Sequence, residues 1–222
     1  MQKIHKFLMG LPHTGQFLAF KPRVAVIRMA GVIADSSQMK KASISKQKYK
    51  KDIERAFEIP NLKAVALVIN SPGGAPTQCS LLSAQIRKLA EDKEVPIYAF
   101  IEDVAASGGY WRACCGDHIF AQSTSVIGSI GVISASFGFE DFIKRYDIHR
   151  RVHTAGKEKS FMDPFVEEKT ADVARLKKIQ QSMHEDFIEW VKERRKERLS
   201  AKDTDLFQGA FWTGGQAETL GL

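Results

Sequence analysis

The chain has 222 residues, of which 44% are hydrophobic and 27% charged, a composition typical of a globular protein with one sizeable core. Its net charge is +7, but no basic motif is interleaved with aromatic residues, so nucleic acid is not an expected partner. No apolar run reaches the roughly 18 residues that a membrane-spanning helix needs.

Positive charge gathers in three stretches: Lys40-Lys41, residues 46–51 and residues 194–196. We interpret these stretches as solvated helix faces. Attraction to an anionic membrane surface is the alternative, because clustered lysine and arginine side chains favour anionic lipid.

The N-terminal stretch has some features of a signal peptide, since Lys3 and Lys6 precede the apolar run 7–11. Pro12 ends that run, however, and no small-residue cleavage site follows. We therefore expect residues 1–21 to be an extension that lies on a surface or contacts another subunit. One domain is expected over residues 22–222.

From Arg23 onward, apolar periodicity predicts strands and helices in alternation. Strands are expected at 23–29, 64–69, 95–101, 118–121 and 150–153, and helices at 45–57, 77–90, 108–115, 139–146 and 167–199. Helix 77–90 should face inward with Leu81, Leu82, Ile86 and Leu89. The alternation predicts an α/β fold with right-handed crossovers and a mostly parallel sheet.

Two glycine turns, at 72–74 and 107–109, follow two successive predicted strands. The carboxyl ends of strands are where open α/β sheets bind ligands. Ser107 lies between two alanines and two glycines, which leave its hydroxyl uncrowded. The N–H groups of Gly73 or Gly74 and of Gly108 are candidate donors of an oxyanion hole. Ordinary turns are the alternative, and neither turn matches a phosphate-binding motif.

A serine nucleophile needs a base, and the sequence offers two kinds. His118 and His153 lie near predicted strands but in no distinctive motif. Lys159 lies in a loop beside Phe161 and Met162 and could act if burial lowered its pKa from about 10.4 towards neutrality. The residues alone leave this choice open.

The three cysteines, Cys79, Cys114 and Cys115, are odd in number and lack metal-ligand spacing. They are expected to be buried free thiols rather than nucleophiles. Neither a metal site nor a cofactor is expected.

Five short motifs occur in an order that resembles the signal peptide peptidase A family, the Ser–Lys peptidases that include the SohB-type proteases. They are Asn-Ser-Pro-Gly-Gly (70–74), Ala-Ala-Ser-Gly-Gly-Tyr (105–110), Ile-Gly-Ser-Ile-Gly-Val (127–132), Lys-x-x-x-x-Pro (159–164) and Trp-Thr-Gly-Gly-Gln-Ala (212–217). The similarity covers roughly residues 22 to 222.

This resemblance implies a ClpP/crotonase-type α/β spiral of repeated strand–helix units. It implies that Ser107 is the nucleophile, Lys159 the general base, and Gly73 or Gly74 part of the oxyanion hole. It also implies ring- or dome-like homo-oligomers, sometimes with serine and lysine from neighbouring protomers. Peptides, including signal-peptide remnants, are the implied substrates.

A substrate groove for small apolar side chains is expected along the glycine-punctuated segment that begins at residue 126. Its candidate lining residues are Val126, Ile127, Gly128, Ser129 and Ile130. Ser129 is also a candidate for orienting Lys159, with a simple turn serine as the alternative.

Other function classes share parts of this pattern. A crotonase-type acyl-CoA enzyme uses the same glycine-built oxyanion hole without a nucleophile, and a ClpP-like Ser–His–Asp peptidase would use a histidine. A non-catalytic scaffold at a membrane is the third alternative. We expect a cytoplasmic protein, and the basic segments leave open a peripheral contact with the inner face of the membrane.

Overall fold

A computed structural model describes residues 21–35, 43–156, 158–200 and 202–222. The chain divides into two compact units, Met1–Ile130 with Trp190–Leu222 and Gly131–Glu189, called here the core unit and the second unit. The expected extension, apart from Lys21, lies outside the described residues.

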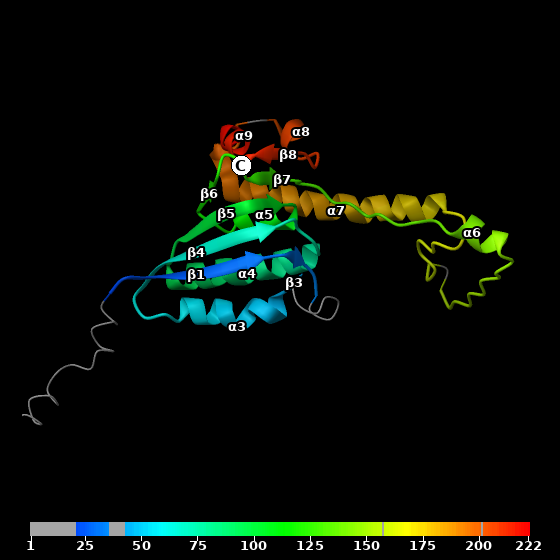
Figure 1. Cartoon of the computed structure of the whole chain (residues 1–222), viewed down its shortest axis with the longest axis horizontal. Coiled ribbons are helices and arrows are strands. Elements are labelled where there is room, and N and C mark those ends of the chain that lie inside the picture. Colours follow the sequence, from blue (N-terminus) through cyan, green and yellow to red (C-terminus); the bar gives the residue numbers. More distant parts are fainter. Residues whose placement is uncertain (1–20, 36–42, 157, 201) are drawn as a thin grey trace, which may run out of the picture. The chain divides into compact units, whose positions relative to one another are not determined.

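The core unit is built on one six-stranded sheet (Figure 1). Its strands are β1 (Arg23–Ala30), β4 (Leu62–Ser71), β5 (Ile97–Ala106), β6 (His118–Ala121), β7 (Val126–Gly128) and β8 (Phe211–Thr213). The order is β1-β4-β5-β7-β8, with β6 also paired to β5. All pairs are parallel except β7–β8, and a small parallel sheet joins β2 (Val32–Ile33) to β3 (Ser43–Ile44).

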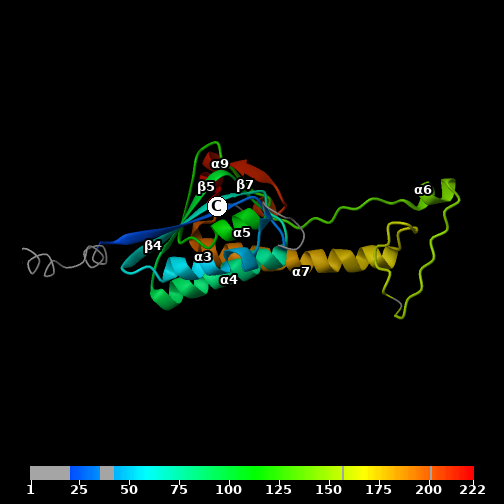
Figure 2. The same cartoon turned by 60° about the horizontal axis from the view of Figure 1, so that its bottom comes forward.

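Helices α3 (Lys46–Phe57), α4 (Pro76–Lys93) and α5 (Gly108–Ala113) lie on one face of this sheet (Figure 2). Ser45 caps α3 by accepting a hydrogen bond from the Lys48 N–H. The strands turn alternate residues toward these helices. On β1 and β4, Ile27 pairs with Leu67, and both side chains are buried. This alternation is what a sheet with a helix layer on one side requires.

Further helices lie in both units within the described residues. In the core unit these are the 3-10 turn Lys196–Arg198, α8 (Asp203–Leu206) and α9 (Gly214–Leu220). The second unit contains α6 (Glu140–Arg145), and α7 (Thr170–Arg195) begins in the second unit and ends in the core unit.

The predicted α/β class, with repeated strand–helix units and a mostly parallel sheet, is confirmed. Three details differ from the expectations. Residues 150–153 form no strand, β5 runs on to Ala106, and Leu81 is exposed. The inner face of α4 instead includes Cys79 and Ser83, because small side chains fit where α4 packs closely on its neighbours.

The basic stretch at 194–196 was also misinterpreted as a solvated helix face. Arg195 is 7% exposed and donates to the Gly221 carbonyl, and Arg194 donates to the Cys114 carbonyl. These two arginines stabilise the core unit. In the stretch 46–51, by contrast, Lys48, Lys50 and Lys51 are exposed on α3.

Candidate active site

Ser107 occupies the turn between β5 and α5, at the carboxyl end of the central strand. Its φ is 51° and its ψ is −123°, a conformation that non-glycine residues rarely adopt and that often marks functional sites. The Trp111 N–H donates to the Ser107 carbonyl at 3.0 Å and so starts α5 directly behind the serine. The Ser107 side chain is partly exposed, and its hydroxyl makes no hydrogen bond with any described residue.

The Pro-Gly-Gly turn lies directly against Ser107. A methyl group on Gly73 would come within 2.8 Å of Ser107 Cβ and within 3.0 Å of the Gly108 nitrogen. Gly73 and Gly74 have φ values of +106° and +145°, which side chains rarely tolerate. The turn is held by β2, since the Ile33 N–H donates to the Gly73 carbonyl and the Ala75 N–H to the Ile33 carbonyl.

The hydrogen bonds of this turn distinguish between its two glycines. The Gly73 N–H donates to Ser71 Oγ at 3.2 Å, and Ser71 is fully buried. The N–H groups of Gly74 and Gly108, in contrast, have no acceptor within the described ranges. Two unused main-chain donors therefore occur close to Ser107, which is the arrangement that an oxyanion requires.

Strand β7 supports Ser107 from the other side. The Ser107 N–H donates to the Gly128 carbonyl at 2.7 Å, and the Ser129 N–H donates to the Ala210 carbonyl at 2.7 Å. Both edges of β7 are paired, with β5 and with β8, so this strand itself cannot accept a further strand.

The expected groove segment divides into buried and accessible residues. The side chains of Ile127 and Ile130 are buried, Val126 is 39% exposed and Ser129 is partly exposed. Only Val126 and Ser129 of this set can present a side chain to a bound peptide. The groove itself stays a prediction.

Lys159 belongs to the second unit, where its backbone N–H donates to the Gly156 carbonyl and its side chain is exposed. Its pairing with Ser107 therefore stays a prediction, as does the suggestion that Ser129 orients it.

The segment that follows Lys159 is fixed by carboxylates within the second unit. Asp163, whose side chain is 5% exposed, accepts from Arg150 Nε at 2.9 Å and from the Phe165 N–H at 3.1 Å. Asp172 accepts from the Met162 N–H at 3.3 Å. These bonds give the loop of the predicted base a defined conformation.

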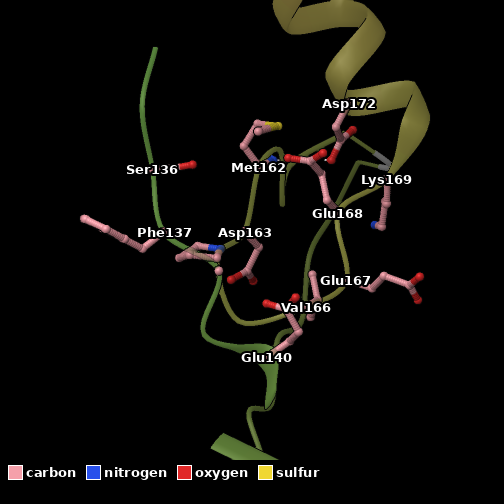
Figure 3. A pocket seen from close by; sticks show the side chains of 12 residues that line it. Ser136, Phe137, Glu140, Met162, Asp163, Val166, Glu167, Glu168, Lys169 and Asp172 are labelled. Carbon is pink, nitrogen blue, oxygen red and sulfur yellow. Dashed lines mark hydrogen bonds between the residues drawn. The ribbon is translucent and has the colours of Figure 1, made fainter. Parts of the chain in front are cut away.

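A pocket of about 170 Å³ adjoins this segment (Figure 3). Five carboxylates line it: Glu140, Asp163, Glu167, Glu168 and Asp172. Across the described residues, however, no group of three or more His, Cys, Asp or Glu side chains is placed to hold a metal ion.

The two candidate histidines are not equivalent. His118 pairs with Tyr98 across β6 and β5 and stacks on its ring at 5.8 Å. Ser107 follows Tyr98 by nine residues along an extended strand, about 30 Å at 3.3 Å per residue. His118 of the same chain therefore cannot take the proton of Ser107. His153 is an exposed residue of the second unit.

The predicted burial of the thiols is confirmed, since Cys79, Cys114 and Cys115 are free and buried. Burial raises the pKa of Cys79 to about 11 and that of Cys114 to about 12. A neutral thiol is a poor nucleophile, so these residues are structural.

Sequence reasoning missed an ion-pair cluster that fixes α5 and its surroundings. Asp117 accepts from Arg87 and Arg194 at 3.0 Å each, and from the Ile97 N–H at 2.8 Å. Burial raises the pKa of the Asp117 carboxyl, but the Ile97 amide and the two arginines outweigh it, so the pKa lies below its ordinary value. The cluster joins α4, β5 and the end of α7 close to where α5 ends.

The model of Peptidase family S49 matches residues 89–222. A protein named Na(+)/H(+) antiporter NhaA from Brucella melitensis biotype 1 is 45% identical over 93% of this chain, which spans 28% of that protein.

Other similar proteins carry protease names. Serine protease SPPA, chloroplastic, from Arabidopsis thaliana is 30% identical over 91% of this chain and is covered over 30% of its own length. A protein named Probable protease SohB from Buchnera aphidicola subsp. Schizaphis graminum is 33% identical over 68% of this chain and is covered over 43%. The chain thus spans less than half of each of these relatives. None of the helices in the described ranges has the length and apolar character needed to cross a membrane.

Proposed function

The chain belongs to peptidase family S49, with its SppA- and SohB-named relatives, and from this premise we propose that it is a serine peptidase with Ser107 as nucleophile and Lys159 as general base. The observation that carries the proposal is the Ser107 turn, where a strained serine adjoins two main-chain N–H groups that have no acceptor among the described residues. A turn that served only to connect β5 to α5 would not need this combination.

In the proposed reaction, neutral Lys159 Nζ takes the proton of Ser107 Oγ as that oxygen attacks a peptide carbonyl. The N–H groups of Gly74 and Gly108 stabilise the oxyanion of the tetrahedral intermediate. The protonated lysine then gives its proton to the leaving amine, and an acyl-enzyme remains. Lys159 next activates a water molecule, which releases the acid and regenerates the serine.

Lys159 must be neutral for this role, and a lysine is neutral near pH 7 only when it is shielded from water. Lys159 is exposed in the single chain. We therefore propose that the active form is a homo-oligomer, in which the serine and the lysine come from one chain or from neighbouring protomers. Exposed apolar residues in the second unit, among them Ile133 and Phe137, support association.

The proposed substrates are small or unfolded peptides with small apolar side chains, including remnants of signal peptides. Val126, which is 39% exposed, and Gly128, whose carbonyl accepts from the Ser107 N–H, support this choice, because β7 presents an apolar side chain and a position without a side chain next to β5. We place the reaction in the cytoplasm. The exposed lysines of α3 support a peripheral contact with the inner face of the membrane.

The test is cleavage of an unfolded apolar peptide by the assembled protein. Ser107→Ala and Lys159→Ala should each lower kcat/KM by about 10⁴-fold or more, because both groups act in the same steps. Ser123→Ala and Lys177→Ala are matched controls at exposed positions and should retain activity. Full turnover by Ser107→Ala would reject the nucleophile, and CoA-thioester turnover by that variant would support a crotonase-type enzyme instead.

A further inference from the structure

Both proposed oxyanion donors are N–H groups of glycines, and a glycine has no side chain that could hold its own peptide in place. The positions of the Gly74 and Gly108 nitrogens therefore depend on the residues that pack against them. Ile33 on β2 and Cys79 on α4 are two such residues, and both lie outside the motifs of the candidate site. Their exposed fractions are 1% and 0%.

Ile33 lies against both glycines. A methyl group on Gly74 would overlap the Ile33 carbonyl oxygen and would come within 2.9 Å of the Ile33 nitrogen. The two residues also form a parallel β-bridge. At the other turn, a methyl group on Gly108 would lie 2.8 Å from Ile33 Cδ1. The main chain of Ile33 thus packs on one proposed donor and its side chain on the other.

Cys79 lies on the same side of Gly108, since a methyl group there would also overlap Cys79 Sγ. The Cys79 thiol donates to the Ala75 carbonyl at 3.2 Å, and the Ala75 N–H donates to the Ile33 carbonyl at 2.8 Å. Ile33, Ala75 and Cys79 therefore form a continuous set of contacts that joins the Gly74 turn to the Gly108 turn.

The main chain around Gly108 needs this support. The Trp111 N–H donates to the Ser107 carbonyl at 3.0 Å and so orients the peptide between Ser107 and Gly108. The next two residues are both glycines, however, and the Gly108 N–H has no acceptor among the described residues. Catalytic groups must be held to within about 0.5 Å of their productive positions. Packing must therefore supply what hydrogen bonds to Gly108 do not.

We infer, on the basis of the proposed function, that Ile33 and Cys79 are positioning residues whose side chains hold the Gly108 N–H at the correct separation from the Gly74 N–H. Both residues are too deeply buried to touch a peptide substrate. Because the oxyanion forms only after the attack on the carbonyl, loss of this positioning should lower kcat and leave KM unchanged.

Cleavage of an unfolded apolar peptide by the assembled full-length protein tests the role of Cys79. Cys79→Ala should lower kcat about tenfold while KM stays within about twofold, because the Gly108 N–H is displaced but not lost. Cys79→Ser places a hydroxyl where the thiol was and should restore kcat to within about threefold of the natural value. Cys115→Ala is the matched control, since it removes the same atom at another fully buried position, and it should leave kcat unchanged.

Ile33→Val tests the second contact with a smaller change. It removes only the Cδ1 methyl group, so the main-chain hydrogen bonds of Ile33 remain. We expect kcat to fall about threefold. Ile44→Val is the control, because Ile44 pairs with Ile33 on β3 and is equally buried. Both changes should cost about 1 kcal/mol of stability, so urea unfolding should not distinguish them, whereas kcat should.

Ser107→Ala, measured in the same assay, separates the inference from the proposed function. If this variant is inactive and kcat falls in Cys79→Ala and Ile33→Val but not in their controls, the inference is supported. If it is inactive but Cys79→Ala and Cys115→Ala have the same kcat, the proposed function stands and the inference is overturned. A raised KM in place of a lowered kcat in Cys79→Ala would also overturn the inference. Full turnover by Ser107→Ala would reject the proposed function and the inference together.

Discussion

The two units hold their parts of the proposed active site in different ways. In the core unit, Ser107 is fixed by strand register and main-chain hydrogen bonds to β7, and Gly73 is fixed by β2. In the second unit, Lys159 lies in a loop whose conformation depends on a few carboxylates. The proposed nucleophile is thus built into the fold, whereas the position of the proposed base depends on side chains that single substitutions can remove.

After the loss of Ser107 or Lys159 themselves, the largest expected effect comes from the turn beside the proposed nucleophile. Gly73→Ala would press a methyl group against Ser107 and force an unfavourable φ. We expect kcat/KM to fall about 10²–10³-fold, as for the loss of an oxyanion donor. Gly215→Ala, where an added methyl group meets nothing within 4 Å, is the control and should leave peptide cleavage intact. Equal activity of the two variants would show that the Pro-Gly-Gly turn does not shape the site.

The next effect concerns stability of the core unit. Asp117→Asn should lower the free energy of unfolding by about 2 kcal/mol, since it weakens three charge-assisted hydrogen bonds at a partly exposed site. Because the pKa of Asp117 is lower in the folded than in the unfolded chain, its contribution is complete above about pH 4. It is lost as pH falls through the folded-state pKa.

Urea unfolding of both proteins at several pH values checks this prediction. The natural chain should be the more stable one at pH 6. The difference in the free energy of unfolding between the two proteins should decrease on acidification below about pH 4. A stability difference that stays constant down to strongly acidic pH would mean that the charge of the Asp117 carboxylate does not contribute to stability.

A smaller effect is expected in the second unit. Asp163→Asn keeps the shape of the side chain but weakens its bond to Arg150, and so loosens the segment after Lys159. We expect kcat/KM to fall about tenfold, or about 1.4 kcal/mol, with unchanged unfolding of the core unit. Fluorescence of the stacked Trp111 and Trp190 reports that unfolding. Lower stability of the core in this variant would remove the distinction between the units.

The smallest expected effect is an increase in the free energy of unfolding. Arg112 is fully buried in α5, and none of its guanidinium nitrogens has a partner in the described part of the chain. Burial lowers the pKa of this guanidinium. Arg112→Met should raise the free energy of unfolding by about 1 kcal/mol, because an apolar side chain of similar size avoids burying an uncompensated charge. A lower melting temperature for this variant would show that the charge has a partner in solution.

Much of the fold could be predicted because the signals are local. The Ser45 cap, the β6 strand at 118–121 and the glycine turns after β4 and β5 each follow from a few neighbouring residues. Leu81 was placed inside α4 because periodicity does not specify which small residues the neighbouring helix accommodates. Residues 150–153 contain one apolar side chain, Val152, and have no partner strand among the described residues.

The candidate site likewise has features that local sequence signals predict and features that they do not. The proximity of Gly73 to Ser107 follows from two adjacent parallel strands, which a sequence of alternating elements predicts. The Gly73 bond to Ser71 and the Asp117 cluster could not be predicted, because they join residues whose spacing carries no motif. His118 could be rejected only once its register with Tyr98 was known.

The three buried sulfhydryls have a practical consequence. At pH 7 a group with a pKa of about 11 is ionised in about one molecule in 10⁴, so Cys79 reacts slowly even with a reagent that reaches it. Any cysteine engineered onto the surface is ionised far more often. An engineered surface cysteine can thus be labelled for spectroscopy with little reaction of the three natural cysteines, which need not be removed.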